Sequence, residues 1–494
     1  MNAHGFSFLN DIQKNNDEMS YHIIIFNNNW DDYRRIPCDN KKNNKYKHMK
    51  KMMKTVSLFL LATVLMVACK PKNAYEKITH NPLLYTQMQH ELNYVIIYDI
   101  FTPPVASRVF AYSNLAAYEV LAKEGKHIET LEGKIKDLDS IPAPTAEEKT
   151  AIDYPFAATL AFLKVGKELT FSQDKMQHIT DSLLDVVRQS GMPDKMYTSS
   201  VAYATTVANA IIRWSKKDNY AQTRGARFTV TNLEGHWEPT PPGYFDAVEP
   251  KWMTIRTLVM DSAGQIKAPG PIPFSKQPGS PFYKMAQQVQ ETGNHLDSNQ
   301  KWIANFWDCN SFKLHVQGHL MFATKAMTPC GHWMEIAGTI AKNKNADFYK
   351  TVYTYTGVSL GIFDAFIASW YAKYTYDLVR PETFINKYID PNWKPYLQTP
   401  PFPEYNSAHS TISSASAAVL KTIYGNETPF RDSSERNWGW PDRSFPSLDS
   451  AAREVSMSRY YGGIHYLPSV WDAYAQGKEI GLMVMSKLLK NYKE

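Results

Sequence analysis

The sequence predicts an all-α protein built from two helical bundles that a proline-rich irregular segment joins. Three observations predict this class. Apolar residues recur at three- and four-residue spacing along most of the chain, alternating apolar and polar runs are scarce, and prolines gather between residues 218 and 281. With 494 residues, 44% of them hydrophobic, the chain can bury a large core.

The first 68 residues differ from the rest. Residues 1–48 are rich in Asn and Lys and show no amphipathic period, and we expect them to be upstream sequence before a true start at Met49, Met52 or Met53. Residues 49–68 then carry a basic stretch and a short apolar run, which is the pattern of a secretory signal. The run is shorter than the roughly 20 apolar residues that a membrane-spanning helix needs.

A cysteine directly follows this apolar run. Cys69 after Ala68 resembles the lipobox of bacterial lipoproteins, although Met66 occupies the place where leucine is usual. We therefore expect lipidation at Cys69, a tether over residues 69–80, and an exported protein that its lipid anchors to a membrane, facing the periplasm or the cell surface. The N-terminal lipid would be the only contact with the membrane.

The charge balance argues against nucleic acid as a partner. The chain has a net charge of +6, and residues 1–68 hold ten Lys and Arg against six Asp and Glu, so their removal would leave a charge of about +2. A nearly neutral protein has no general electrostatic attraction for nucleic acid.

Helices are expected on both sides of the proline-rich segment. Residues 81–217 form the N-terminal helices, residues 218–281 the irregular excursion, and residues 282–494 the C-terminal bundle. Trp and Phe within the excursion indicate that it packs on the surface instead of serving as a free linker. The clearest helical patterns are Val105–Ala122, Tyr154–Val165, Ile179–Val187, Val201–Trp214, Met285–Thr292, Gln300–Trp307, Val352–Tyr371, Thr411–Tyr424 and Val470–Leu489.

Cys309 and Cys330 remain in the expected mature chain. In an oxidising compartment they could form a disulfide, and two free buried thiols are the alternative. His315 and His319 stand four residues apart, a spacing that can bind zinc, but they lack the glutamate of an H-E-x-x-H motif, so a zinc site there is disfavoured.

Three short segments of the C-terminal bundle carry residues suited to chemistry. In the first, Lys373 and Arg380 stand seven residues apart, two helical turns, and Pro381 then ends the expected helix. An ammonium and a guanidinium on one helix face would form a clamp for an oxyanion.

The second segment is a proline-stiffened loop that runs through Ser407, Ala408 and His409 into a helix expected to begin near Ser410. Amide groups at a helix start favour anions, the serine adds a hydroxyl, and a histidine there can exchange a proton with the bound group. In the third segment, two glycines between Arg459 and His465 allow a bend that brings both side chains to one site.

This ordered set, K-x(6)-R-P, then S-x-H, then S-R-x(5)-H, resembles the superfamily of vanadium-dependent haloperoxidases and type 2 phosphatidic acid phosphatases. The resemblance implies an all-helical fold whose pocket binds vanadate or phosphate. Residue by residue, it implies oxyanion binding by Lys373, Arg380, Ser407, the Ala408 amide and Arg459. It implies three catalytic residues: His409 for acid–base chemistry, His465 for the bond to vanadium or to phosphorus, and Lys373, which would polarise the bound peroxide for halide attack. It also implies pocket aromatics at Trp370 and Phe402, and a carboxylate at Asp308 that orients His409.

The chain departs from the family pattern at two places. Asn406 and Ala408 replace the Pro and Gly of a P-S-G-H motif, and Ser469 stands where the family has an aspartate four residues after the last histidine. That aspartate would orient His465 and raise its basicity. Asp472 is the candidate to replace it.

The function that the resemblance implies is oxidation of halide by hydrogen peroxide at a histidine-bound vanadate. The alternative is a phosphatase that hydrolyses a phosphomonoester through a phosphohistidine in the same pocket, with no cofactor. Because of Ser469 and Asn406, a non-catalytic oxyanion-binding lipoprotein is a third possibility.

Overall fold

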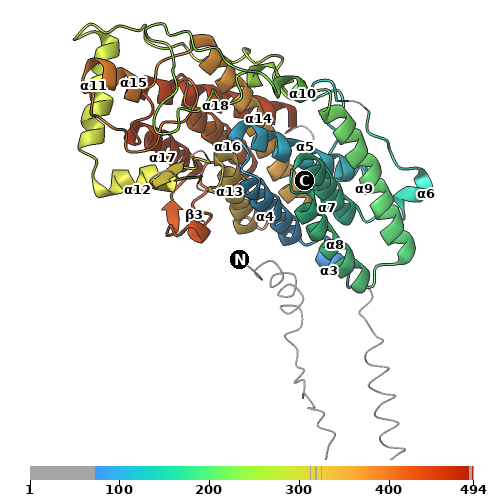
Figure 1. Cartoon of the computed structure of the whole chain (residues 1–494). Coiled ribbons are helices and arrows are strands. Elements are labelled where there is room, and N and C mark those ends of the chain that lie inside the picture. Colours follow the sequence, from blue (N-terminus) through green and yellow to red (C-terminus); the bar gives the residue numbers. More distant parts are fainter. Residues whose placement is uncertain are drawn as a thin grey trace, which may run out of the picture. The chain divides into compact units, whose positions relative to one another are not determined.

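The computed structural model describes residues 73–138, 140–311, 313–317, 320–323, 325–488 and 492 (Figure 1). The expected upstream extension, the signal segment, Cys69 and His319 lie outside these residues. The described residues within 79–188 and 193–494 form one compact unit. Within the described ranges, no helix combines the length and the apolar character needed to cross a membrane.

The prediction of an all-α fold is confirmed. Helices dominate both halves of the described chain, and short strands form two antiparallel hairpins, β1 with β2 and β3 with β4. The elements are α3 (Glu76–Thr79), α4 (Pro82–Tyr98), α5 (Pro103–Ala122), α6 (Ala146–Lys149), α7 (Tyr154–Leu169), α8 (Gln173–Gln189), α9 (Asp194–Ser215), α10 (Tyr220–Thr223), η1 (Trp252–Thr254), α11 (Pro281–Asn294), α12 (Ser298–Phe306), β1 (Leu314–Gln317), β2 (Leu320–Ala323), α13 (Pro329–Asn343), α14 (Phe348–Tyr376), α15 (Pro381–Tyr388), α16 (Ala408–Tyr424), β3 (Phe430–Asp432), η2 (Arg436–Trp438), β4 (Arg443–Phe445), α17 (Leu448–Tyr461) and α18 (Leu467–Leu488).

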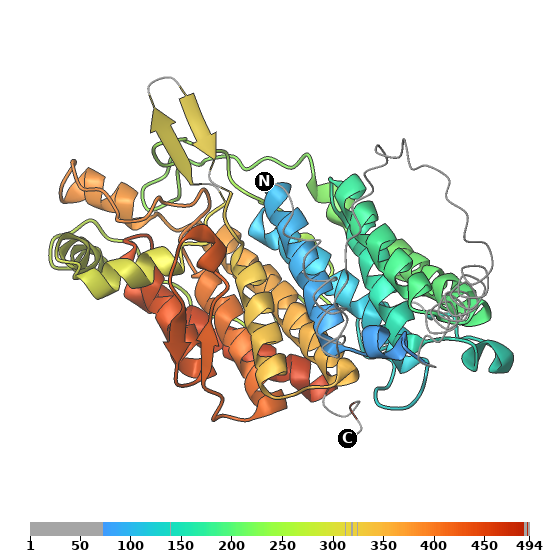
Figure 2. The same ribbon diagram turned by 90° about the horizontal axis from the view of Figure 1, so that it is seen from below.

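Helix α14 is the centre of the core. Its side chains are buried around the whole circumference for most of its length, as expected for a helix that is apolar on every face. It packs against α4 and α5 of the N-terminal half and against α13, α16 and α18 of the C-terminal half. Figure 2 shows these helices side by side, with the blue and green N-terminal helices on one side and the orange and red C-terminal helices on the other.

Helices α16 and α18 approach each other very closely. A Cβ atom added at Gly477 would lie 1.9 Å from the carbonyl oxygen of Thr411, and one at Gly481 would lie 2.4 Å from that of Ala415. Only glycine permits this contact between the backbones. The close approach explains why α16 is rich in Ala and Ser, and it holds the N-terminal end of α16 in a fixed position.

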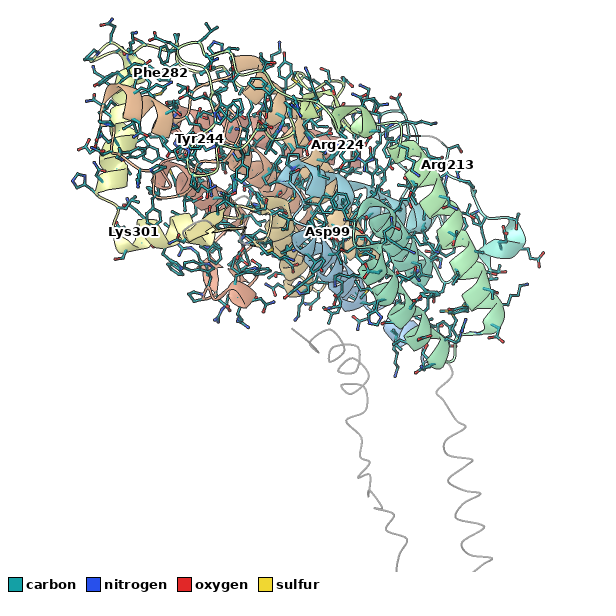
Figure 3. The ribbon with its side chains drawn as sticks, in the orientation of Figure 1. Asp99, Arg213, Arg224, Tyr244, Phe282 and Lys301 are labelled. Atoms are coloured by element: carbon teal, nitrogen blue, oxygen red, sulfur yellow. The ribbon has the colours of Figure 1, made fainter. Side chains whose placement is uncertain are left out.

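The proline-rich excursion packs against the helical body, as its aromatic residues indicated. Trp237 and Trp252 within it are almost completely buried. The buried carboxylate of Asp364 on α14 accepts the backbone N–H groups of Leu258, Val259 and Met260. Figure 3 shows the side chains along this segment, among them the labelled Arg224 and Tyr244.

Candidate active site

The expectation that Lys373 and Arg380 share one helix face is wrong. Helix α14 ends at Tyr376, because Asp377 adopts a left-handed conformation (φ 46°) and its N–H caps the carbonyl of Lys373. Arg380 then has an extended backbone and is the residue before the first turn of α15. Both side chains are nevertheless fully buried in the same region, so the two cations meet through a loop and not along a helix.

Lys373 holds the proline-stiffened loop. Its ammonium donates hydrogen bonds to the carbonyl oxygens of Pro403 (3.0 Å), Glu404 (3.1 Å) and Asn406 (2.6 Å). These three acceptors use all three hydrogens of an ammonium group. Burial and the neighbouring Arg380 guanidinium hold the pKa of Lys373 well below its usual value.

Arg380 joins the loop to the last histidine. Its Nε donates to the carbonyl of Phe402 at 2.8 Å, and its Nη1 donates to the carbonyl of Ile464 at 2.8 Å and lies 3.2 Å from Nε2 of His465. Its Nη2, also buried, has no partner among the described residues. Burial lowers the pKa of Arg380 to about 10.

The helix expected near Ser410 begins at Ala408, and Ser407 is its N-cap. The Ser407 hydroxyl oxygen accepts hydrogen bonds from the amide (3.4 Å) and the hydroxyl (2.9 Å) of Ser410, so its own hydrogen remains available to donate. The amide of Ala408 lies in the first turn, where no intrahelical acceptor exists. Both groups can therefore bind an anion at this helix end.

Asn406, which replaces a proline of the family motif, has a structural explanation. Its side chain accepts a hydrogen bond from Ser369 of α14 at 3.0 Å and donates one to Gln476 of α18 at 2.8 Å. The amide thus bridges two helices behind the loop and holds the backbone that carries Ser407.

His409 is oriented by a backbone group. Its ring hydrogen-bonds to the backbone of Asp308, whereas the Asp308 carboxylate pairs with Lys313 at 3.0 Å and lies 3.9 Å from Nη2 of Arg459. The expectation that this carboxylate orients His409 is therefore wrong. His409 Nε2 has no partner within the described chain. Burial, and then the charges of Arg459 and Lys373, lower the pKa of His409 well below its usual value, so the ring is neutral.

The carboxylate that contacts His465 is Glu404, a residue that the sequence reasoning missed. Its Oε1 lies 2.7 Å from Nδ1 of His465. Asp472, the candidate from the sequence, instead accepts a hydrogen bond from the Tyr405 hydroxyl at 3.0 Å. Glu404 lies in the proline-stiffened loop five residues before His409, and its position inside that motif was the available signal.

The Glu404–His465 pair is buried among the cations. Burial raises the pKa of Glu404 to about 7, against the opposing effects of Arg380 and Lys373. Burial, followed by the charges of Arg380 and Lys373, holds the pKa of His465 well below its usual value. The imidazole is therefore neutral, with its Nδ1 hydrogen directed to Glu404 and its Nε2 lone pair toward the cations.

Arg459 reaches the site from the end of α17. Its Nη1 donates to the carbonyl of Trp307 at 2.6 Å, and its buried Nε is without a partner in the described part of the chain. The helix ends at Tyr461, and Gly463 takes a positive φ (74°), which turns the backbone toward His465. Gly463 therefore makes the bend that the two glycines indicated, whereas Gly462 keeps a right-handed helical backbone (φ −63°).

These groups surround a small cavity, and Phe402 forms part of its wall. Trp370 lies behind Phe402, with ring centroids 5.1 Å apart. Lys373, Arg380 and Ser407 are not among the lining residues and stand behind them. The cavity is lined by Pro103, Asp308, Cys309, Asn310, Pro400, Phe402, Ala408, His409, Arg459, Ile464 and His465.

The positive charges around the cavity favour binding of an anion. Lys373, Arg380 and Arg459 are all buried, and the carboxylates beside them are Glu404, with its pKa raised to about 7, and Asp308 at the edge of the cluster. Burying a charge without a counter-ion costs free energy. Two guanidinium nitrogens, Nη2 of Arg380 and Nε of Arg459, have no hydrogen-bond acceptor among the described residues and can donate to a bound anion. A tetrahedral oxyanion such as vanadate fits this set of donors and the neutral imidazole of His465.

Cys309 and Cys330 are free, buried thiols and do not form a disulfide. The Cys309 sulfur lies 3.5 Å from Nδ1 of His332, and the Cys330 sulfur lies 3.0 Å from the Thr328 hydroxyl. His332 is almost fully buried and stacks on Trp307, with ring centroids 4.4 Å apart.

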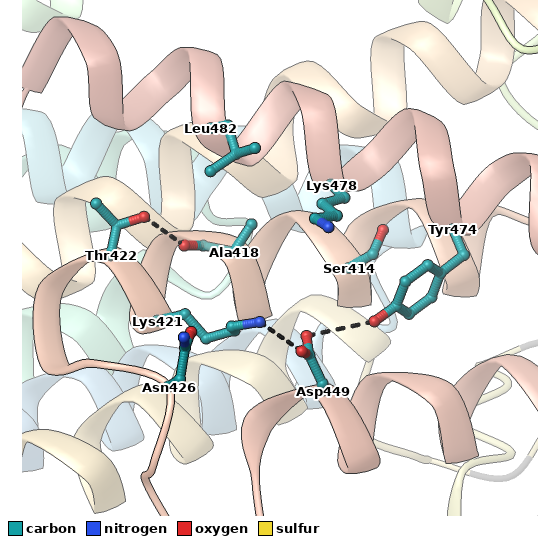
Figure 4. Close-up of a pocket in the computed structure, with 9 residues that line it drawn as sticks. All are labelled: Ser414, Ala418, Lys421, Thr422, Asn426, Asp449, Tyr474, Lys478 and Leu482. Atoms are coloured by element: carbon teal, nitrogen blue, oxygen red, sulfur yellow. Dashed lines mark hydrogen bonds and ion pairs between the residues drawn. The ribbon is translucent and has the colours of Figure 1, made fainter.

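A second pocket lies between α16, α17 and α18 (Figure 4). Lys421 forms an ion pair with Asp449 there, and the Tyr474 hydroxyl lies 3.4 Å from the same carboxylate. None of the residues that line this pocket is a histidine or one of the three buried cations. The chemistry that the sequence indicated is therefore gathered at the first cavity.

Comparisons with known proteins indicate the family of the chain. Residues 353–494 match the VCPO second helical-bundle domain. The crystal structure of a bacterial vanadium-dependent iodoperoxidase has 41% sequence identity and a TM-score of 0.78, and the match covers 85% of this chain and 98% of that one.

Two further structures share the fold at low identity. The apo and holo forms of a bacterial vanadium-dependent chloroperoxidase are each 16% identical, with TM-scores of 0.61 and 0.60. Each match covers 79% of this chain, and 94% and 93% of theirs. No curated protein sequence matches the chain. From the extent and identity of the iodoperoxidase match, the chain belongs to the vanadium-dependent haloperoxidases and is an enzyme of that family.

Proposed function

We propose that this enzyme oxidises iodide with hydrogen peroxide at a vanadate bound to His465. The observation that carries the proposal is the neutral imidazole of His465 among three buried cations, with Glu404 fixing its far nitrogen. Membership of the family implies vanadate as the cofactor. The choice of iodide is supported by the relative that is 41% identical and is an iodoperoxidase.

His465 would hold the cofactor through Nε2. The Nδ1 hydrogen points to Glu404, so the Nε2 lone pair is free to bond a metal, and a carboxylate on the far nitrogen strengthens such a ligand. Arg380 Nη1, now 3.2 Å from Nε2, would turn its hydrogen to an oxygen of the bound group. Bound vanadate supplies a Lewis-acidic centre that activates hydrogen peroxide toward halide.

The remaining groups would bind the oxygens of the cofactor. Arg380 and Arg459 offer guanidinium hydrogens, and Ser407 and Ala408 offer a hydroxyl and an amide at the start of α16. Lys373 contributes its charge from behind the loop, since its hydrogens are engaged by three carbonyl groups. This set neutralises a multiply charged oxyanion without water.

His409 would take the proton of hydrogen peroxide. His409 lines the cavity and its Nε2 is unpartnered among the described residues. In the anion-free protein, burial and the neighbouring cations lower the pKa of His409, which leaves that nitrogen able to accept a proton. The halide would enter along the apolar wall of Pro103, Pro400, Phe402 and Ile464. Iodide is a weakly hydrated anion, so an apolar wall beside buried cations favours it over smaller halides.

The experiment loads the purified full chain with orthovanadate and measures triiodide formation from iodide and hydrogen peroxide. Hydrolysis of p-nitrophenyl phosphate is measured in parallel without vanadate. We expect vanadate-dependent iodide oxidation that exceeds bromide oxidation. Hydrolysis without any halide oxidation would instead assign the site to a phosphatase, and tight vanadate binding with neither activity would assign it to a non-catalytic oxyanion-binding protein.

A further inference from the structure

A second cluster of reactive side chains lies beside the oxyanion cavity. It consists of Cys309 from the loop after α12, His332 from α13 and Glu435 from the segment between β3 and η2, and all three are buried. Cys309 also lines the cavity. The mechanism proposed above uses none of these residues.

The distances between the candidate ligand atoms of the cluster match those between neighbouring ligands around one metal ion. The Cys309 sulfur lies 3.5 Å from Nδ1 of His332 and 3.9 Å from Oε1 of Glu435, and that oxygen lies 3.4 Å from the same nitrogen. For tetrahedral zinc, the usual bond lengths place sulfur, nitrogen and oxygen ligands roughly 3.3 to 3.6 Å from one another. The three atoms are therefore nearly in place around a shared centre.

The surroundings of His332 support the same assignment. Its other ring nitrogen, Nε2, lies 2.7 Å from the carboxylate of Asp432, which the Ser434 hydroxyl and amide hold in turn. A metal-binding histidine commonly donates its second nitrogen to a carboxylate in this way, which fixes the ring orientation. The stacking of His332 on Trp307 restrains the ring further.

Charge balance also favours a cation. The cluster buries a thiol, an imidazole and two carboxylates within one small volume. A divalent ion bound to a cysteine thiolate, the Glu435 carboxylate and the neutral imidazole of His332 would give a neutral centre. The thiol proton, and any proton on Nδ1 of His332 or on Glu435, would leave to solvent as the metal binds. The Asp432 carboxylate would then keep its hydrogen bond to the imidazole.

We propose that Cys309, His332 and Glu435 form a binding site for a zinc-class divalent cation. Thiolate, imidazole and carboxylate are the ligand types that suit zinc. Three protein ligands leave a fourth position for water or another ligand. The ion would join three separate chain segments, and so would fix Asp308, whose backbone contacts His409.

The test uses the full chain without vanadate, so that its outcome does not depend on halide oxidation. Protein dialysed against a chelator is titrated with Zn²⁺ by calorimetry, and a second sample is titrated with Co²⁺ and followed by absorption. We expect one ion per chain and a thiolate-to-cobalt charge-transfer band in the near ultraviolet. Weak, non-stoichiometric binding, or stoichiometric binding without that band, would overturn the proposal.

Variants locate the site. Cys309→Ser is expected to remove the charge-transfer band, whereas Cys330→Ser, which alters a buried thiol outside the cluster, is the matched control and should retain it. Asp432→Asn should keep the band and weaken binding about 10- to 100-fold. A band that survives in Cys309→Ser, or disappears in Cys330→Ser, would refute the assignment. Circular dichroism of each variant before metal addition confirms that it is folded.

Discussion

Glu404 Oε1 accepts hydrogen bonds from both the imidazole of His465, at 2.7 Å, and the backbone N–H of Tyr466, at 3.1 Å. This double contact fixes which nitrogen of His465 carries the hydrogen and which faces the cations. The carboxylate comes from the proline-stiffened loop that Lys373 clamps, so the loop positions the histidine as well as the oxyanion donors. Ser469 stands where the family has an aspartate, and Glu404 makes the contact to His465 that this aspartate would make.

We therefore predict that Glu404→Gln weakens vanadate binding by about 10- to 100-fold, because the amide is a poorer acceptor for the imidazole and makes His465 less basic. Equilibrium dialysis with metal analysis measures the affinity. Because the carboxylate form of Glu404 is the stronger acceptor, the vanadate affinity of the wild type should fall as the pH drops below about 7, the pKa of Glu404 in the free protein. The affinity of the variant should not show this pH dependence.

The control for this prediction is Asp472→Asn, which alters the carboxylate that binds the Tyr405 hydroxyl. Its vanadate affinity should equal that of the wild type. A loss of affinity in Asp472→Asn, with Glu404→Gln unaffected, would show that the histidine depends on the other carboxylate.

Arg459 lines the cavity and carries an unpartnered Nε, so Arg459→Ala removes a donor aimed at the bound oxyanion. We expect vanadate affinity and iodide oxidation to fall by about 100-fold or more, which is the usual effect of removing one preorganised donor. Arg453→Ala changes an exposed arginine six residues earlier on α17 and should leave both properties unchanged. Full activity in Arg459→Ala would mean that the reaction occurs elsewhere.

The sequence predicted the identity of the oxyanion-binding residues better than their local geometry. The spacing of Lys373 and Arg380 suggested one helix, but a left-handed residue at Asp377 ends α14 between them, and non-glycine residues adopt that conformation for tertiary reasons that spacing does not reveal. Ser407 and His409 were placed close to the correct helix start because N-cap preferences are local.

The residues that the sequence did not reveal act through contacts between distant segments. Glu404 meets His465 across 61 positions, and His332 meets Asp432 across 100. A carboxylate in a loop looks the same in a sequence whether it faces solvent or a histidine. Since the family's aspartate is replaced by Ser469, the sequence favoured Asp472, which lies close to that position in the chain, but the Asp472 carboxylate contacts Tyr405.

Lys373 stabilises the loop as well as the charge of the site. Lys373→Met keeps most of the side-chain volume but leaves three buried carbonyl groups without a donor, and we expect the free energy of unfolding to fall by about 2 to 3 kcal/mol. Urea unfolding at neutral pH measures the change. Lys387→Met, which removes a half-exposed lysine paired with Glu238, is the control and should change stability by less than about 1 kcal/mol. Equal stability of the two variants would contradict this role.

Proton uptake tests the state of His409. In the anion-free protein its pKa lies well below the usual value, chiefly through burial and then through Arg459 and Lys373. A bound dianion offsets those two charges and should raise this pKa. Between the two values, binding therefore takes up protons, and affinity falls as the pH rises through the higher value.

Sulfate is a suitable probe, because it is tetrahedral and does not itself titrate near neutral pH. Calorimetry near pH 6 in two buffers of different ionisation enthalpy should show net proton uptake by the wild type and a clear reduction in His409→Gln. His295→Gln, which alters an exposed histidine outside the site, should match the wild type. Proton release on sulfate binding, or the same uptake in His409→Gln, would show that His409 is not the group whose charge the oxyanion controls.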